Sequence, residues 1–155
     1  MNERILAALM VALLLTGCTG MPEYTTEPEN VTELAACPSR PNCVTSADDP
    51  DDSHYIAPIA IEGDPDAAWQ ALEQILAEDG SFEITATADH YIRAVATTAI
   101  LRFKDDVEFL LYRDAARIEM RSASRVGYSD LGKNRKRIEE IRSRMIEAGV
   151  AAARD

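Results

Sequence analysis

Two segments of alternating residues, 103–112 and 116–124, restrict what this chain can fold into. The connection between them centres on Asp114 and Ala115, which suit a two-residue hairpin turn. Such a turn fixes a register that pairs Phe109 with Met120, so apolar residues of the two strands gather on one face. On the other face Glu108 opposes Arg121, and we expect an ion pair on the protein surface there. The segments therefore predict an antiparallel hairpin with one face on a hydrophobic core.

Helical patterns lie on both sides of these strands. Asp64 and Pro65 are typical of a helix N-terminus, and apolar residues then recur every three or four positions until Gly80. A second helix is expected to begin near Ser129 and Asp130. Its inward stripe comprises Leu131, Asn134, Ile138, Ile141, Met145 and Ala148.

The remaining strand patterns complete one domain, which we place at residues 37–150. Residues 55–61 alternate, although Pro58 confines this strand to an edge or a bulge. Residues 81–88 and 91–98 are typical of a second hairpin. The order of elements predicts an α+β fold, a small antiparallel sheet of about five strands with two helices packed on one face.

The first residues have the pattern of a targeting signal. Arg4 precedes an unbroken apolar run, 5–15, which is shorter than the roughly 20 residues of a membrane-spanning helix. The run ends in Leu-Thr-Gly-Cys, with the cysteine at position 18, and this resembles the lipobox of bacterial lipoproteins. The resemblance implies removal of a signal peptide, residues 1–17, and acylation of Cys18 with fatty acids such as palmitate. An ordinary secretory signal followed by a chance cysteine is the alternative.

The expected location is the bacterial cell envelope, on the periplasmic side, with the membrane as a partner through the lipid on Cys18. Thr19 rather than Asp follows the cysteine, and the sorting pattern of lipoproteins then favours the outer membrane. Residues 18–36 contain two prolines, several glutamates and no apolar period, so we expect an acidic, extended and mobile linker. Nucleic-acid binding is not expected, because the net charge is −11 and such binding needs a basic surface.

A pair of cysteines, Cys37 and Cys43, opens the predicted domain. In the oxidising periplasm these thiols are expected to form a disulfide. A zinc site is the weaker alternative, because zinc ligands are typically about two to four residues apart and histidines are scarce here. The acidic run 48–52 lacks the glycine and glutamate that an EF-hand calcium loop requires. No metal or other cofactor is predicted.

Polar residues gather at one end of the apolar face of the first hairpin. The register places Asp105 opposite Ser124, and Asn134 would reach them from the last helix. Because buried polar groups need partners, the favoured interpretation is a structural network. A binding pocket is the alternative, with Arg125 and Tyr128 at its rim. The candidate binding residues are then Asp105, Ser122, Ser124, Arg125, Tyr128 and Asn134.

Catalysis by these residues is a further alternative, a hydrolase that uses Asp105 and Ser124. A serine nucleophile needs a base within reach. His90 is expected on a distant hairpin turn and His54 in the approach to the domain. We therefore assign no catalytic residue.

Three motifs together are similar to one family. They are CPSRPNCVTS at 37–46, RFKDDVEF at 102–109 and RSASRVGYSDLGKNRKRIEEIR at 121–142. They resemble the bacterial and plant family catalogued as domain of unknown function 1499, and the resemblance covers residues 37–146. It supports a single fold and implies no reaction. We expect a lipid-anchored envelope protein that recognises a small ligand, a lipid or a partner protein without catalysis; a hydrolase and a purely structural envelope component are the alternatives.

Overall fold

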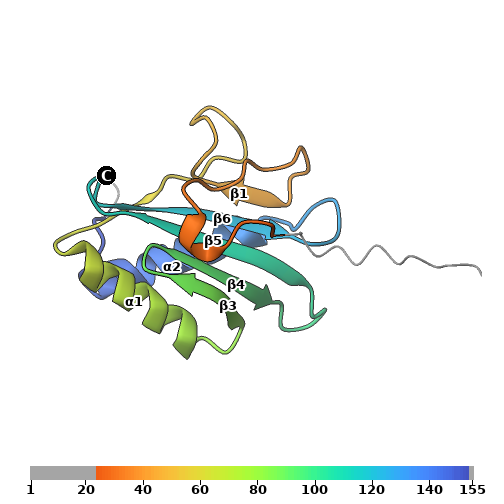
Figure 1. The fold of residues 1–155 in the computed structure, drawn as a ribbon. Helices are drawn as coiled ribbons and strands as arrows, with labels where there is room; N and C mark the ends of the chain where they lie inside the picture. The colour runs from red at the N-terminus through yellow and green to blue at the C-terminus, as the bar shows by residue number, and fades with distance from the viewer. Residues whose placement is uncertain (1–23, 154–155) are drawn as a thin grey trace, which may run out of the picture.

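The computed structural model of the protein describes residues 24–153, so the expected signal peptide and Cys18 lie outside the described residues. A six-stranded antiparallel sheet forms the centre. Helices α1 (Pro65–Glu78) and α2 (Lys133–Glu147) cover one of its faces (Figure 1). This architecture confirms the predicted α+β class. No helix within the described range is long and apolar enough to cross a membrane.

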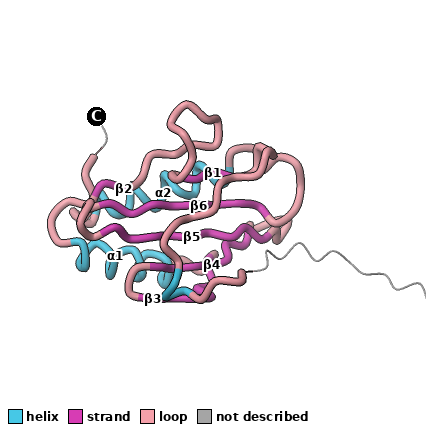
Figure 2. The backbone as a smooth tube through the Cα atoms, turned by 45° about the horizontal axis from the view of Figure 1, so that its top comes forward, coloured by secondary structure: helices cyan, strands magenta, loops and turns pink. Residues whose placement is uncertain are grey.

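The strands follow the order β1-β6-β5-β4-β3, and β2 also pairs with the outer edge of β6 (Figure 2). The register of β5 and β6 pairs Phe109 with Met120 and Asp105 with Ser124, as predicted. In β3 the register shifts between Ile84 and Ala86. The strands are β1 (Cys43–Thr45), β2 (Ile59–Ala60), β3 (Phe82–Ala88), β4 (Tyr91–Thr97), β5 (Lys104–Tyr112) and β6 (Arg117–Ser124).

The outer edge of β6 differs from the prediction. Strand β1 was not predicted, and of the predicted strand 55–61 only Ile59–Ala60 pairs as a strand. Pro58 has no N–H group to donate to a ladder. The carbonyl groups of Ala57 and Pro58 instead accept hydrogen bonds from the buried guanidinium of Arg142 on α2. At residues 57–58 a side chain of α2 thus provides the hydrogen bonds that a neighbouring strand would otherwise provide.

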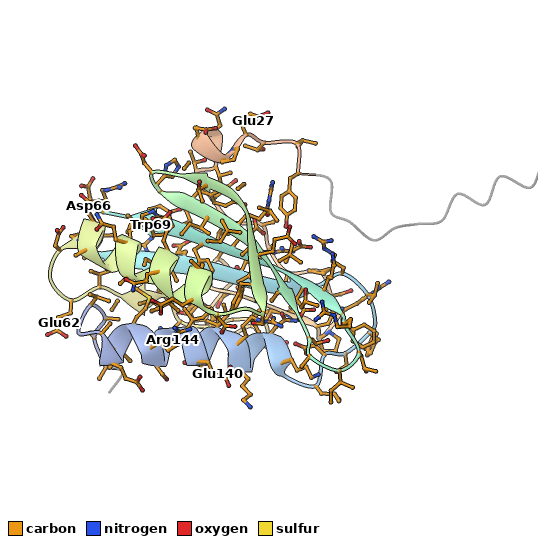
Figure 3. The ribbon with its side chains drawn as sticks, turned by 90° about the horizontal axis from the view of Figure 1, so that it is seen from below. Glu27, Glu62, Asp66, Trp69, Glu140 and Arg144 are labelled. Atoms are coloured by element: carbon orange, nitrogen blue, oxygen red, sulfur yellow. A yellow bond between two sulfur atoms is a disulfide. The ribbon has the colours of Figure 1, made fainter. Side chains whose placement is uncertain are left out.

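The main core lies between the sheet and the two helices. Asp64 caps α1 by accepting a hydrogen bond from the backbone N–H of Asp66 at 3.1 Å, and Trp69 of this helix points toward the sheet (Figure 3). Each large side chain buried here contributes about 1.5–3 kcal/mol. Fully buried members of the core include Leu72, Leu76, Ile92, Phe109, Ile118, Met120, Ile138 and Met145.

Helix α2 begins at Lys133, later than predicted. Leu131 has a positive φ of 56° and is 89% exposed, so it is not part of the inward stripe. Asp130 still serves the helix start, because its Oδ2 accepts a hydrogen bond from the N–H of Asn134 at 2.7 Å. Ala148 is exposed at the other end. The four central stripe residues are buried as predicted: Asn134, Ile138, Ile141 and Met145.

Residues 24–36, which we call the strap, lie across the face of the sheet that the helices leave uncovered. The strap contains a short 3-10 helix, η1 (Pro28–Asn30), and Glu27 before it lies on the opposite side of the sheet from α1 and α2 (Figure 3). Leu34 is only 5% exposed and forms a second hydrophobic cluster with Tyr91 and Leu110. The described part of the expected linker is therefore extended but packed, and the prediction of a mobile spacer is wrong for it.

Hydrogen bonds from β5 and from the β3–β4 turn also hold the strap. The hydroxyl of Tyr112 donates to the carbonyl of Thr32 at 2.8 Å. The ring Nε2 of His90, on the β3–β4 turn, lies 2.8 Å from the carbonyl oxygen of Val31. We call the face of the sheet that the helices leave uncovered the second face. The strap packs there because Tyr91 and Leu110 on this face would otherwise be exposed to water.

Candidate functional site

The polar residues predicted to converge do so at one end of the core. The hydroxyl of Ser122 donates to Oδ1 of Asn134 at 2.6 Å. The Nδ2 of Asn134 donates to Oγ of Ser124 at 3.0 Å. Asp105 faces Ser124 across the β5–β6 ladder, on the same face of the sheet. We call these four residues, with Arg137, the polar network.

Sequence reasoning missed Arg137 as a member of this network. Its Nη1 donates to Oδ1 of Asn134 at 2.7 Å and to the hydroxyl of Ser122 at 3.0 Å. Its Nη2 donates to Oδ2 of Asp105 at 2.5 Å. The available signal was spacing, because residues three apart on a helix are neighbours and Arg137 follows Asn134 by that interval. The guanidinium thus neutralises the one carboxylate on the core face of β5.

The polar side chains of the network have hydrogen-bond partners within the protein. Asn134 is fully buried, and its Nδ2 also donates to the carbonyl of Asn42 at 2.9 Å. Ser122 is fully buried and Asp105 nearly so. Each of these side chains already has a protein partner, as buried polar groups require. The network therefore ties β5, β6, α2 and the residue before β1 together.

The two expected rim residues lie elsewhere. Arg125 is on the second face, where its Nε and Nη2 hold the carboxylate of Asp106 at 3.0 and 2.8 Å. The hydrogen bond to Asp106 raises the pKa of Arg125. Tyr128 is 73% exposed in the loop between β6 and α2. Neither side chain is hydrogen-bonded to the polar network.

The groups proposed for hydrolysis have other partners. Ser124 accepts a hydrogen bond from Asn134, and Asp105 is bound by Arg137. His54 places Nδ1 at 2.9 Å from the carbonyl oxygen of Cys43. His90 contacts the strap, as described above. The described residues thus place no histidine beside Ser124.

A disulfide joins Cys37 and Cys43, as predicted, with an S–S distance of 2.06 Å and a Cα–Cα distance of 5.7 Å. Cys37 follows the strap directly, and Cys43 is the first residue of β1. The bridge therefore links the end of the strap to the edge of the sheet.

A cleft of about 930 Å³ opens between the strap and the second face of the sheet. We call it the strap cleft. Sequence reasoning missed it, because the strap has no apolar period that predicts packing. Its wall on the sheet side consists of Tyr91, Glu108, Tyr112, Glu119 and Arg121, and its wall on the other side includes Tyr24, Thr25, Val31, Thr32 and Leu34.

Glu108 is the central charge of this cleft. It accepts hydrogen bonds from the hydroxyl of Tyr91 at 2.7 Å and from Nη1 of Arg121 at 3.1 Å. Burial, and next the nearby negative charge of Glu108, raise the pKa of Tyr91. The predicted pairing of Glu108 with Arg121 is confirmed, but its predicted exposure is wrong, because the strap covers this part of the sheet.

Two polar atoms at the strap cleft lack a hydrogen-bond partner. Within residues 24–153, the hydroxyl of Tyr24 and Nε of Arg121 are the buried side-chain oxygen and nitrogen atoms without one. The guanidinium of Arg93 lies 3.8 Å from the centre of the Tyr24 ring. Burial raises the pKa of Tyr24, so its hydroxyl keeps its proton. Both unpaired groups are therefore hydrogen-bond donors at neutral pH.

Comparison with protein families identifies a model that matches most of the chain. The model of the family described as "Protein of unknown function (DUF1499)" matches residues 33–145. No curated protein and no solved structure matches the chain.

Proposed function

Because this chain belongs to the DUF1499 family of proteins of unknown function, we propose its function from its own residues: it is a lipid-anchored protein of the bacterial cell envelope that binds a small ligand in the strap cleft without reacting with it. The observation that carries the binding role is the pair of unpartnered donors, Tyr24 Oη and Arg121 Nε, at one cleft. Leaving a buried donor unpaired costs about 1–3 kcal/mol. Because both atoms are shielded from solvent in this structure, a ligand removes this cost by displacing the strap enough to bring an acceptor to them.

The charges of the cleft define the ligand class. Arg121 Nε and the Tyr24 hydroxyl require acceptor oxygens on the ligand. Glu108 and Glu119 line the same cleft and repel a strongly anionic molecule. Tyr112, which is partly exposed, adds aromatic surface on which an apolar face of the ligand can pack. The ligand is therefore a small polar molecule that is neutral or zwitterionic, such as a sugar or an amino acid derivative.

Binding can be tested with a matched pair of arginine variants. Ligand-observed NMR with a set of neutral sugars, amino acids and dipeptides should detect binding to the wild-type protein. Arg121→Leu should abolish it, because this variant removes a donor from the cleft. Arg125→Leu should retain it, because Arg125 pairs with Asp106 outside the cleft lining. Equal binding by both variants, or no binding by the wild type to any member of the set, would contradict the proposal.

The proposal of a membrane anchor rests on the apolar run 5–15 and on the Leu-Thr-Gly-Cys pattern that places Cys18 directly after it. Cells grown with an alkyne fatty acid should incorporate the label into the wild-type protein and not into Cys18→Ser. The wild-type protein should also remain with the membrane fraction after a high-salt wash. A wild-type protein without the label would rule out acylation at this position.

A further inference from the structure

The exposed apolar side chains of this protein are concentrated in two loops. Among residues 24–153, the large hydrophobic side chains with high exposure are Ile100, Leu101, Phe103, Val126, Tyr128 and Leu131. The first three lie between β4 and β5, and the others lie between β6 and α2. Ile100 is 90% exposed and Leu131 is 89% exposed. Side chains of this kind that gather at one place mark an interaction site.

The two loops are neighbours at one end of the sheet, on the right in Figure 1. The last pair of the β5–β6 ladder, Asp105 and Ser124, lies between them. The N–H of Arg125 donates to the carbonyl of Lys104 at 3.1 Å, which joins the loop bases. The Nδ2 of Asn42 donates to the carbonyl of Gly127 at 2.9 Å and holds the second loop. We call residues 98–104 and 125–133 the loop end.

The charge of the loop end is opposite to that of the whole chain. It contains four basic residues and one acidic residue, a net charge of +3, whereas the chain carries −11. The acid, Asp130, is engaged with the N–H groups of Gly132 and Asn134 at the start of α2. The basic residues are Arg102, Lys104, Arg125 and Lys133. Arg125 is paired with Asp106, so the cations available to lipid phosphates are the other three, which are exposed. Exposed apolar tips among cations match the interface of an anionic membrane, where chains insert and headgroups pair with the cations.

The path of the strap leads toward the same end. Thr32 is hydrogen-bonded to Tyr112, at the end of β5 far from the loop end. Tyr24, at the start of the strap, stacks against the guanidinium of Arg93. Arg93 lies opposite Glu108 in the β4–β5 ladder, at a position nearer the loop end. The strap therefore runs toward the loop end as it is followed back to Tyr24 (Figure 1). An extended residue spans at most about 3.6 Å, so the short stretch from Tyr24 back to Cys18 reaches no further than about 20 Å. A lipid on Cys18 would thus hold this end of the domain near the bilayer.

We propose that the loop end docks on an anionic lipid surface, with the apolar loop tips inserted at the headgroup boundary and the surrounding cations on lipid phosphates. This inference rests on the proposed lipid anchor on Cys18. A docked loop end fixes the orientation of the domain and places the opposite end, with the β5–β6 turn, away from the membrane. Weak binding by the loop end is sufficient for such docking, because the lipid anchor already supplies most of the membrane affinity.

The test is a fluorescent probe at each end of the domain. Leu101→Cys places a thiol at the loop end, and Asp114→Cys places one on the exposed β5–β6 turn as a matched control. Cys37 and Cys43 are joined, so the new thiol can be labelled selectively with an environment-sensitive dye. The full-length lipoprotein purified from membranes is reconstituted in vesicles of phosphatidylethanolamine and phosphatidylglycerol, and circular dichroism checks that both variants are folded.

The dye at position 101 should shift to shorter emission wavelengths in these vesicles, and the dye at position 114 should not. Because each cation at an anionic surface contributes about 1 kcal/mol, Arg102→Gln should lower the ratio of docked to undocked protein about fivefold. Protein that floats with the vesicles but shows no shift at 101 overturns docking and leaves the anchor intact. Protein that does not float overturns both proposals. A shift seen only in native envelopes, and not in lipid vesicles, overturns lipid docking in favour of a protein partner.

Discussion

Arg137 of α2 binds Asp105 of β5 through a hydrogen bond of 2.5 Å between Nη2 and Oδ2, and the protein covers both side chains almost completely. The carboxylate lies on the apolar face of the sheet, where an unpaired charge is strongly unfavourable. The arginine in turn bonds Ser122 and Asn134, so one guanidinium completes the whole polar network.

Asp105→Ala should therefore destabilise the domain severely. Removing one partner of a buried ion pair costs about 3–5 kcal/mol, because the other charge stays buried without compensation. The double variant Asp105→Ala with Arg137→Leu should be more stable than Asp105→Ala alone. Urea denaturation measures both. Glu140→Ala, which breaks the exposed pair with Lys136, is the control and should change stability by less than about 1 kcal/mol.

Leu34→Ala should destabilise the domain by about 2–5 kcal/mol, as truncation of a buried leucine does. Leu34 lies in the strap and packs on Tyr91 and Leu110 of the second face. The neighbouring Glu33 is exposed, so Glu33→Ala is the matched control and should leave the melting temperature nearly unchanged. Equal melting temperatures for Leu34→Ala and the wild type would mean that the strap does not stay on the sheet in solution.

Replacing both cysteines of the Cys37–Cys43 bridge by alanine should lower the free energy of unfolding by about 2.4 kcal/mol, the value of the chain-entropy model for a loop of this size. The same loss should appear when the wild-type protein is reduced before denaturation. Reduction of the alanine variant should then have no effect. A wild-type stability that does not respond to reduction would contradict this prediction.

Alkaline pH should unfold the domain through Tyr91. The native pKa of this hydroxyl is raised by burial and by Glu108, whereas in the unfolded chain it has the ordinary value near 10. Above that pH the unfolded chain binds fewer protons than the native state, so stability falls as the pH rises, and below it the contribution of Tyr91 is fully present. Tyr91→Phe should flatten the decline between pH 10 and pH 12, measured by urea denaturation at a series of pH values. An unchanged slope in the variant would assign the alkaline transition to another group.

The polar network shows what local sequence patterns can establish. A two-residue turn and a period of two fix the β5–β6 register, and that register alone places Asp105, Ser122 and Ser124 on one face. The helical period then adds Asn134. Arg137 was not predicted to enter the core, because arginine side chains are mostly exposed and the helical period does not show which of them have buried hydrogen-bond partners.

Local sequence patterns do not predict what covers the second face of the sheet. The alternation that pairs Glu108 with Arg121 does not reveal whether a distant segment covers them. The strap that does so has two apolar anchors, Val31 and Leu34, too few to form a period. The strap cleft, which exists only between strap and sheet, was therefore missed as well. Strand β1 was missed for a similar reason, since three residues carry no detectable alternation.

The interrupted register of β3 has a consequence for molecules held side by side. A long, regular outer strand offers unpaired backbone groups to another chain and promotes aggregation. Here one edge strand is irregular between Ile84 and Ala86, and β1 at the other edge has only three residues. Neither edge is a good template for a strand from a neighbouring copy. Crowding at a surface would therefore bring these domains into contact without joining their sheets into one.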